Sequence, residues 1–215
     1  MSFTHILFDL DNTLYPRETG LLRELDRRIQ QWTEQELGLT AAEATAMRKD
    51  YFVRYGTTLS GLVAEWQVDV EDYLAFVHDV QPARYLRPDP ALAAMLRAIP
   101  LCKVVFTNAP AEHARRVLDT LGVADRFERL LDIRAVGMCS KPRPAAYDRA
   151  LALLDARGPA CIMVEDNPAN LRPAKALGMT TVLVGAPLEN GVDFARPTVL
   201  DVGPLVAQWI SGDGP

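Results

Sequence analysis

The chain has 215 residues, of which 49% are hydrophobic and 24% are charged, and its net charge is −5. This length and composition predict one α/β domain with a small insertion, or two small domains, with a core that needs no disulfides. The acidic balance without a basic stripe predicts no nucleic-acid partner, and without an apolar run of about 18 residues or a leader pattern we expect no membrane partner. We therefore expect a cytoplasmic protein.

The first predicted strand, His5–Phe8, is followed by two aspartates that stand two positions apart, Asp9 and Asp11. In an extended chain such residues point to the same side. Open α/β sheets bind ligands at the carboxyl edge of their strands, where this pair would lie. Two carboxylates so close repel each other unless a cation joins them. A polar turn would contain the same residue types, so the later motifs decide between the two interpretations.

After the first strand the pattern changes to helix, and no strand pattern returns over residues 17–85. An apolar stripe with Ile29 and Trp32 runs along the first helix, and Thr40 forms a capping-box pattern before the second. The predicted helices cover residues 18–37, 40–54, 59–66 and 69–79. Residues 17–85 therefore form an inserted helical block, with Trp32 and Trp66 in its core.

Strands and helices alternate from residue 86 onward, which is the pattern of a parallel sheet built from βα units. The predicted strands cover 102–106, 130–134, 160–164 and 180–184, and the predicted helices cover 90–98, 110–121, 143–155 and 168–177. The tail predicts an edge strand over 198–202, a short helix over 205–210 and a frayed end over 211–215. Residues 1–16 and 86–215 thus form the core, and 17–85 a separate helical unit.

Further polar groups stand at the ends of later strands and loops. Thr107 and Asn108 follow the strand 102–106, Lys141 precedes a helix, and Glu165 and Asp166 follow the strand 160–164. Each residue alone is weak evidence, because a threonine is a common cap and a lone lysine is usually solvated. Together and in this order they predict one site at the carboxyl edge of the sheet.

This ordered set resembles the haloacid dehalogenase superfamily of phosphohydrolases, which carries Asp-x-Asp, Thr, Lys and an acidic pair in the same order. The resemblance extends over residues 6–184 and implies a Rossmann-like parallel sheet with an all-helical cap inserted after the first strand. Residues 12–16, 55–62 and 106–109 further resemble the branch that contains pyrimidine 5′-nucleotidases.

The resemblance implies a role for each motif residue. Asp9 would be the nucleophile that forms an aspartyl-phosphate, and Asp11 the general acid and base. Thr107, Lys141 and the backbone of Asn108 would hold the phosphoryl oxygens, where charge gathers in the transition state.

The cofactor implied by the resemblance is Mg²⁺, which prefers oxygen ligands. Its ligands would be the carboxylates of Asp9 and Asp166 and the backbone carbonyl of Asp11, with Glu165 beside them. The chain departs from many relatives at Asn170, where they carry a second acid. Asn170 adds no charge and is therefore not expected to bind the metal.

The expected function is Mg²⁺-dependent hydrolysis of nucleoside 5′-monophosphates, with pyrimidines preferred and with Tyr55 and Thr57 of the cap contacting the substrate. The alternative is a phosphatase or phosphomutase of the same superfamily that acts on a sugar phosphate or another small metabolite. A true haloacid dehalogenase fits less well, because a departing halide needs no acid at Asp11. A receiver-like signalling module fits least, because its acceptor aspartate lies on a later strand than its acidic pair. We expect a monomer or homodimer.

Two residue types are expected to stay outside the chemistry. The three cysteines, Cys102, Cys139 and Cys161, do not form a disulfide pattern, and Cys139 is not expected to be catalytic. The three histidines, His5, His78 and His113, are dispersed in the sequence without metal-ligand spacing. Each is therefore expected to be structural or exposed.

Overall fold

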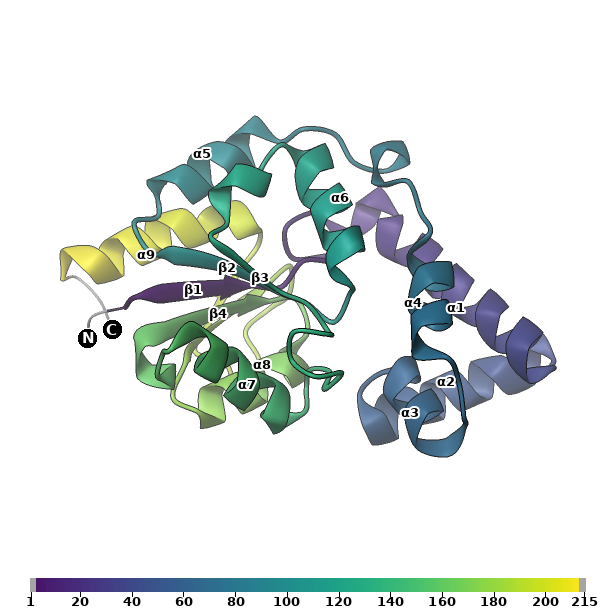
Figure 1. The fold of residues 1–215 in the computed structure, drawn as a ribbon. Helices are drawn as coiled ribbons and strands as arrows, with labels where there is room; N and C mark the ends of the chain where they lie inside the picture. Colours follow the sequence, from purple (N-terminus) through teal and green to yellow (C-terminus); the bar gives the residue numbers. More distant parts are fainter. Residues whose placement is uncertain (1–2, 213–215) are drawn as a thin grey trace.

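The structure is a computed structural model that describes residues 3–212, and its core is a parallel sheet of six strands in the order β3-β2-β1-β4-β5-β6 (Figure 1). The strands are β1 His5–Phe8, β2 Cys102–Phe106, β3 Arg129–Leu131, β4 Cys161–Glu165, β5 Thr180–Val184 and β6 Phe194–Arg196. Side chains alternate between the two faces, so Ile6 and Phe8 enter one apolar cluster and Leu7 enters the other. The predicted parallel sheet is confirmed.

Helices cover both faces of this sheet, as parallel sheets require. One face is covered by α5 Pro90–Ala98, α6 Ala111–Leu121 and α9 Val202–Ser211, and the other by α7 Pro144–Leu154 and α8 Pro168–Ala176 (Figure 1). The apolar stripe of α6 illustrates the cause: Ala114, Val117 and Leu121 are all buried against the sheet.

The inserted helices lie together beside the core and share a separate apolar cluster, to which the core contributes Ile133. They are α1 Leu21–Leu37, α2 Ala41–Tyr55, α3 Thr58–Glu65 and α4 Val70–His78. The predicted capping box at Thr40 is present. Gly61 lets α3 approach α2 closely, because a Cβ at this position would lie 2.2 Å from the ring of Tyr51. Trp32 is buried as expected. Trp66 is 40% exposed because it lies just beyond the end of α3, where the backbone is extended, and its indole N–H donates to the Tyr51 hydroxyl.

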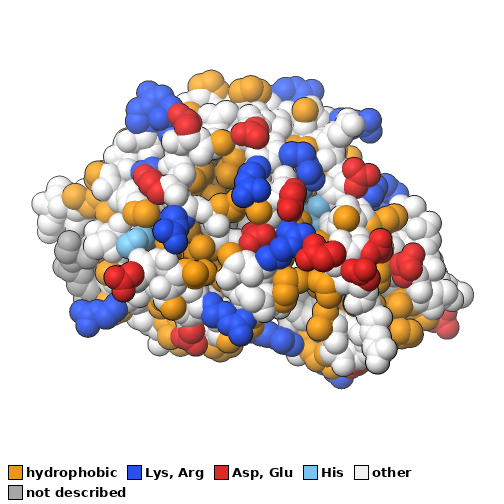
Figure 2. All heavy atoms as spheres, in the orientation of Figure 1, with side chains coloured by type: hydrophobic (Ala, Val, Ile, Leu, Met, Phe, Trp, Pro, Cys, Tyr) orange, Lys and Arg blue, Asp and Glu red, His pale blue; other side chains and the backbone are white. Residues whose placement is uncertain are grey.

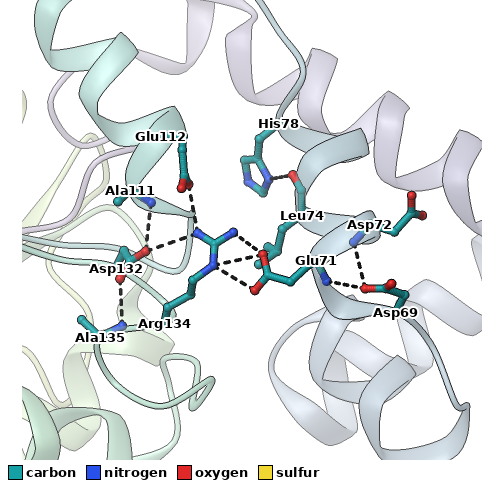
Figure 3. A network of polar contacts seen from close by, with 10 residues as sticks. All are labelled: Asp69, Glu71, Asp72, Leu74, His78, Ala111, Glu112, Asp132, Arg134 and Ala135. Atoms are coloured by element: carbon teal, nitrogen blue, oxygen red, sulfur yellow. Dashed lines mark hydrogen bonds and ion pairs between the residues drawn. The ribbon is translucent and has the colours of Figure 1, made fainter.

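A polar network joins this helical unit, which we call the cap, to the core (Figure 3). Arg134, in the loop after β3, donates to Glu71 of α4 at 2.5 Å and to Glu112 of α6 at 2.9 Å. Asp132 lies 3.7 Å from Arg134 and accepts the backbone N–H groups of Ala111 and Ala135. Arg134 therefore ties the first turn of α4 to the edge of the sheet.

The tail differs from the prediction. Residues 199–201 form a 3₁₀ turn rather than an edge strand, and the edge strand is β6. The reason is local: the Asp201 carboxylate accepts the N–H and O–H of Thr198, which is a capping box that starts the 3₁₀ turn, and α9 follows directly at Val202. Ser211 belongs to α9 rather than to a frayed end, and residues 213–215 of that prediction lie outside the described residues.

Strand β3 ends at Leu131, three residues earlier than predicted, because Asp132 turns its carboxylate back onto backbone N–H groups instead of extending the strand. Among the described residues, no helix combines the length and apolar character that crossing a membrane requires.

Candidate active site

The sheet order brings the predicted motifs to one edge. Strand β1 lies between β2 and β4, and Phe8 pairs with both Val105 and Val164. The residues that follow these three strands are therefore neighbours in space, although more than 90 positions separate Asp9 from Thr107. Asp9, Thr107 and Glu165 meet at this edge because of the parallel register.

Lys141 lies at the centre of the site and is almost fully buried, with 1% of its surface exposed. Its ammonium group donates to Asp9 Oδ1 at 2.7 Å, to Glu165 Oε2 at 2.7 Å and to the carbonyl of Phe106 at 2.8 Å. Burial lowers the pKa of Lys141, but the two carboxylates outweigh burial and hold the pKa above the ordinary lysine value. The lysine therefore stays charged and fixes both acids.

The carboxylates of Asp9, Glu165 and Asp166 form an acidic cluster, with one oxygen of each within 4.8 Å of the others. Burial, and then the charge of Glu165, raise the pKa of Asp9 to about 7. Burial and the charge of Asp9 raise the pKa of Asp166 as well. One lysine faces three acids, so the cluster favours a further positive charge, and its oxygen atoms are the donors that Mg²⁺ prefers. The residues present fit that ion.

The carboxylate of Asp11 is held apart from this cluster. Its Oδ1 accepts hydrogen bonds from the Tyr15 hydroxyl at 2.5 Å and from His113 Nε2 at 3.0 Å. Burial raises the pKa of Asp11, but the charge and hydrogen bond of His113 and the hydrogen bond of Tyr15 outweigh it, so the pKa lies below its ordinary value. Asp9 Oδ2 accepts a different hydrogen bond, from the hydroxyl of Thr13 at 3.3 Å. The two aspartates are thus held by different residues.

Thr107 and Asn108, which follow β2, line the same cavity as Lys141. Thr107 is buried, and its hydroxyl accepts the N–H of Ala109 at 3.0 Å. The Asn108 side chain accepts the backbone N–H of Lys141 at 2.8 Å and donates to the carbonyl of Lys141 at 3.0 Å. Asn108 therefore also positions the loop that carries the lysine, a role that its place in the sequence does not indicate.

A cavity of about 1110 Å³ opens between this edge and the cap. Its floor includes Asp9, Asp11, Thr107, Lys141 and Asp166, together with Asn170. Its cap side is mostly apolar, with Leu22, Ile29, Phe52 and Val63, and it also contains the charged residues Arg48 and Lys49. On the face drawn in Figure 2, acidic and basic side chains intermix where cap and core meet.

The two predicted cap contacts have different positions. Thr57 lines the cavity, and its hydroxyl lies 3.5 Å from that of Ser140, the residue before Lys141. Tyr55 is outside the cavity lining of the described residues, and its hydroxyl donates to Glu65 at 2.6 Å. In this conformation the Tyr55 hydroxyl therefore makes a contact within the cap and does not face the cavity.

Two of the three histidines, although far apart in the sequence, are brought together by the fold. His78 of the cap and His113 of the core lie together, with ring centroids 5.1 Å apart. His113 is fully buried and contacts Asp11, and His78 lines the cavity. The available signal was the position of His113 in the first turn of the helix that follows Thr107, because that turn begins at the carboxyl edge.

The chain matches the family model described as a haloacid dehalogenase-like hydrolase over residues 3–178. It therefore belongs to the haloacid dehalogenase-like hydrolases. Among curated relatives, it is 30% identical over 192 residues to phosphate metabolism protein 8 of Saccharomyces cerevisiae, a match that covers 82% of this chain and 60% of that protein. It is 25% identical over 215 residues to phosphoglycolate phosphatase of Rhodospirillum rubrum, covering 93% and 84%.

Solved structures share the fold at lower identity. A HAD phosphatase from Thermococcus onnurineus matches with a TM-score of 0.64 and 19% identity, covering 99% of each chain. The L-2-haloacid dehalogenase of Xanthobacter autotrophicus matches with a TM-score of 0.62 and 17% identity, covering 95% of this chain and 98% of that one. Since both phosphatases and dehalogenases share this architecture, the fold alone does not select the reaction.

Proposed function

We propose that this hydrolase is a Mg²⁺-dependent phosphomonoesterase that forms an aspartyl-phosphate on Asp9 and acts on nucleoside 5′-monophosphates, with pyrimidines preferred. The observation that carries the reaction class is the separate anchoring of the two aspartates. Lys141 holds Asp9 at 2.7 Å, whereas Tyr15 and His113 hold Asp11. A halide leaves a carbon atom without a proton, so dehalogenation has no use for a second, separately positioned carboxyl group.

The reaction then needs two displacements at phosphorus. The negative charge of the bound phosphate opposes ionisation of Asp11, so this carboxyl group carries a proton in the substrate complex although its pKa is lowered in the free protein. In the first displacement, an oxygen of Asp9 forms a bond to phosphorus as the bond to the ester oxygen breaks, and Asp11 gives its proton to that departing oxygen. In the second, water attacks the aspartyl-phosphate and gives a proton to Asp11, the bond between Asp9 and phosphorus breaks, and inorganic phosphate leaves. Asp11 ends with the proton that it had at the start.

The remaining residues of the edge serve the phosphoryl group. The hydroxyl of Thr107 offers a donor, and the ammonium of Lys141 offers positive charge, to the oxygens on which charge gathers. Asp9, Asp166 and the backbone carbonyl of Asp11 would hold Mg²⁺, which supplies positive charge between an anionic nucleophile and an anionic substrate. Glu165 is 1% exposed and bonded to Lys141, which supports a role behind these ligands.

The size and lining of the cavity support the substrate class. About 1110 Å³ is ample for a nucleoside, and the apolar cap side suits the faces of a base and sugar. Thr57 stands at the boundary between cap and core, where it can contact the leaving group. A smaller metabolite is the alternative, which the likeness to phosphoglycolate phosphatase favours.

A substrate screen tests this proposal. Purified protein is given UMP, CMP, AMP, GMP, glucose 6-phosphate and phosphoglycolate, with Mg²⁺ or with EDTA, and phosphate release is measured; halide release from 2-chloropropionate is measured in parallel. We expect the highest kcat/KM with UMP or CMP, and loss of activity in EDTA. Phosphoglycolate or a sugar phosphate ranking first would replace the nucleotide assignment, and halide release without phosphate release would overturn the phosphatase assignment.

A further inference from the structure

The imidazole of His113 has one hydrogen-bond partner among residues 3–212, and it is the carboxyl group that we assign to proton transfer. Its Nε2 lies 3.0 Å from Asp11 Oδ1, and its side chain is fully buried. The other ring nitrogen, Nδ1, is buried without a hydrogen-bond partner among residues 3–212. An unpaired buried polar atom costs about 1–3 kcal/mol, so a histidine is an unfavourable way merely to fill this space.

The Tyr15 hydroxyl reaches the same oxygen from the other side of the motif. It lies 2.5 Å from Asp11 Oδ1, and its ring is 3% exposed. Two donors on one oxygen restrict rotation of the carboxyl group. No described residue donates to Oδ2, and Asp11 lines the cavity. The second oxygen is thus left for the ester oxygen or for water.

The two residues that bind the Asp11 carboxyl group come from different elements of the fold. Tyr15 follows Asp11 by four positions in the turn after β1, whereas His113 comes from the first turn of α6, after the neighbouring strand β2. His113 continues the buried stripe of that helix with Ala114 and Val117. The carboxyl group is therefore held by two elements whose positions the sheet itself sets.

We propose that His113 is a positioning residue that, with Tyr15, holds Asp11 in the orientation for proton transfer between Oδ2 and the ester oxygen. The proposal rests on the phosphomonoesterase function above. Without these two donors the carboxyl group rotates, and proton delivery to the leaving oxygen becomes inefficient. The nucleophile Asp9 keeps its own bonds to Lys141 and Thr13.

Two substrates of similar size separate positioning from a general structural role. Phenyl phosphate releases a strongly basic oxygen that needs a proton, whereas 4-nitrophenyl phosphate releases a weakly basic one that does not. The value of kcat/KM reports the steps through formation of the aspartyl-phosphate, in which this proton is given. For His113→Leu, we expect kcat/KM to fall at least about tenfold further with phenyl phosphate than with 4-nitrophenyl phosphate, within the usual range for general acid catalysis.

His113→Gln and Tyr15→Phe extend the test. The glutamine amide keeps an N–H donor, so it should recover part of the phenyl phosphate activity. Tyr15→Phe removes the other donor and keeps the ring, so it should show the same leaving-group selectivity even if His113→Leu does not fold. Val117→Ala is the control: it removes a buried group one turn along the same helix, which should lower the thermal midpoint and leave the ratio between substrates unchanged.

The outcomes are distinct. Equal losses with both substrates in His113→Leu and Tyr15→Phe would overturn the positioning role and leave the phosphatase function intact. A wild-type protein that hydrolyses neither substrate in Mg²⁺ would overturn both.

Discussion

Arg134 of the core pairs with Glu71 of the cap, with Nη2 2.5 Å from Oε2, and the same guanidinium binds Glu112 of the core (Figure 3). Glu71 lies in the first turn of α4, and the other end of this helix carries His78 to the cavity. One half-buried side chain thus joins the cap helix to the carboxyl edge of the sheet.

We predict that Arg134→Ala raises KM for the best substrate about two- to fivefold and changes the thermal midpoint little. Exposed ion pairs contribute about 0–1 kcal/mol, and the loss falls on the closed arrangement of cap and core rather than on the core itself. Steady-state kinetics and thermal unfolding measure the two effects. Arg126→Ala is the control, because Arg126 pairs with its neighbour Asp125 within the core. An unchanged KM would show that the network does not govern the cavity.

The two aspartates should respond differently to loss of charge. Asp9→Asn should abolish turnover and leave no phosphoenzyme, because the amide cannot form the bond to phosphorus. Asp11→Asn should lower kcat by about 10²-fold or more, the usual contribution of a general acid. Trapping with labelled substrate and measurement of phosphate release separate the two. Substantial turnover by Asp9→Asn would place the nucleophile elsewhere.

Mg²⁺ should stabilise the folded protein even without substrate. The acidic cluster favours a cation, so saturating Mg²⁺ should raise the thermal midpoint, as any ligand that binds only the folded state does. Asp166→Asn keeps the size of the side chain and removes one ligand charge, so its midpoint should respond much less. Asp193→Asn is a control acid outside the cluster, bonded to Lys175. A wild-type midpoint that ignores Mg²⁺ would contradict the metal assignment.

His78 should make stability depend on pH. Burial, followed by the charge of His113, lowers the pKa of His78 to about 4 from the ordinary value of 6.5. Between these values the unfolded chain binds a proton on His78 and the folded protein does not, so this contribution is present above pH 6.5 and is lost as the pH falls toward 4. The shift corresponds to roughly 3 kcal/mol at most.

The measurement is urea unfolding of the wild-type protein and of His78→Gln from pH 7.5 down to 4.5. We expect the free energy of unfolding to fall more for the wild-type protein than for the variant over this range. Glutamine does not titrate, so the variant lacks the proton uptake by His78 that favours the unfolded chain. Parallel curves for the two proteins would show that burial does not hold His78 neutral.

Local patterns were enough to predict most of the framework. The apolar runs and their polar ends predicted β1, β2 and β5 at their observed bounds, because strand burial and chain punctuation are properties of a few neighbouring residues. The tail was predicted less well. The sequence of residues 198–202 fits both an apolar strand and a capped turn, and the hydrogen bonds between Thr198 and Asp201 favour the turn. Trp66 shows the same limit, because an apolar face does not reveal how far it is covered.

The sequence by itself determined which chemical groups reach the catalytic edge, because parallel strands end at one edge and the motif residues follow those ends. Only the tertiary structure decided how these groups are supported. The contact between Asp11 and His113 joins residues 102 positions apart, and that between Asn108 and Lys141 joins residues 33 positions apart. Such contacts depend on the pitch and position of whole helices and loops over neighbouring strands, which the packing of the entire core sets and no short segment encodes.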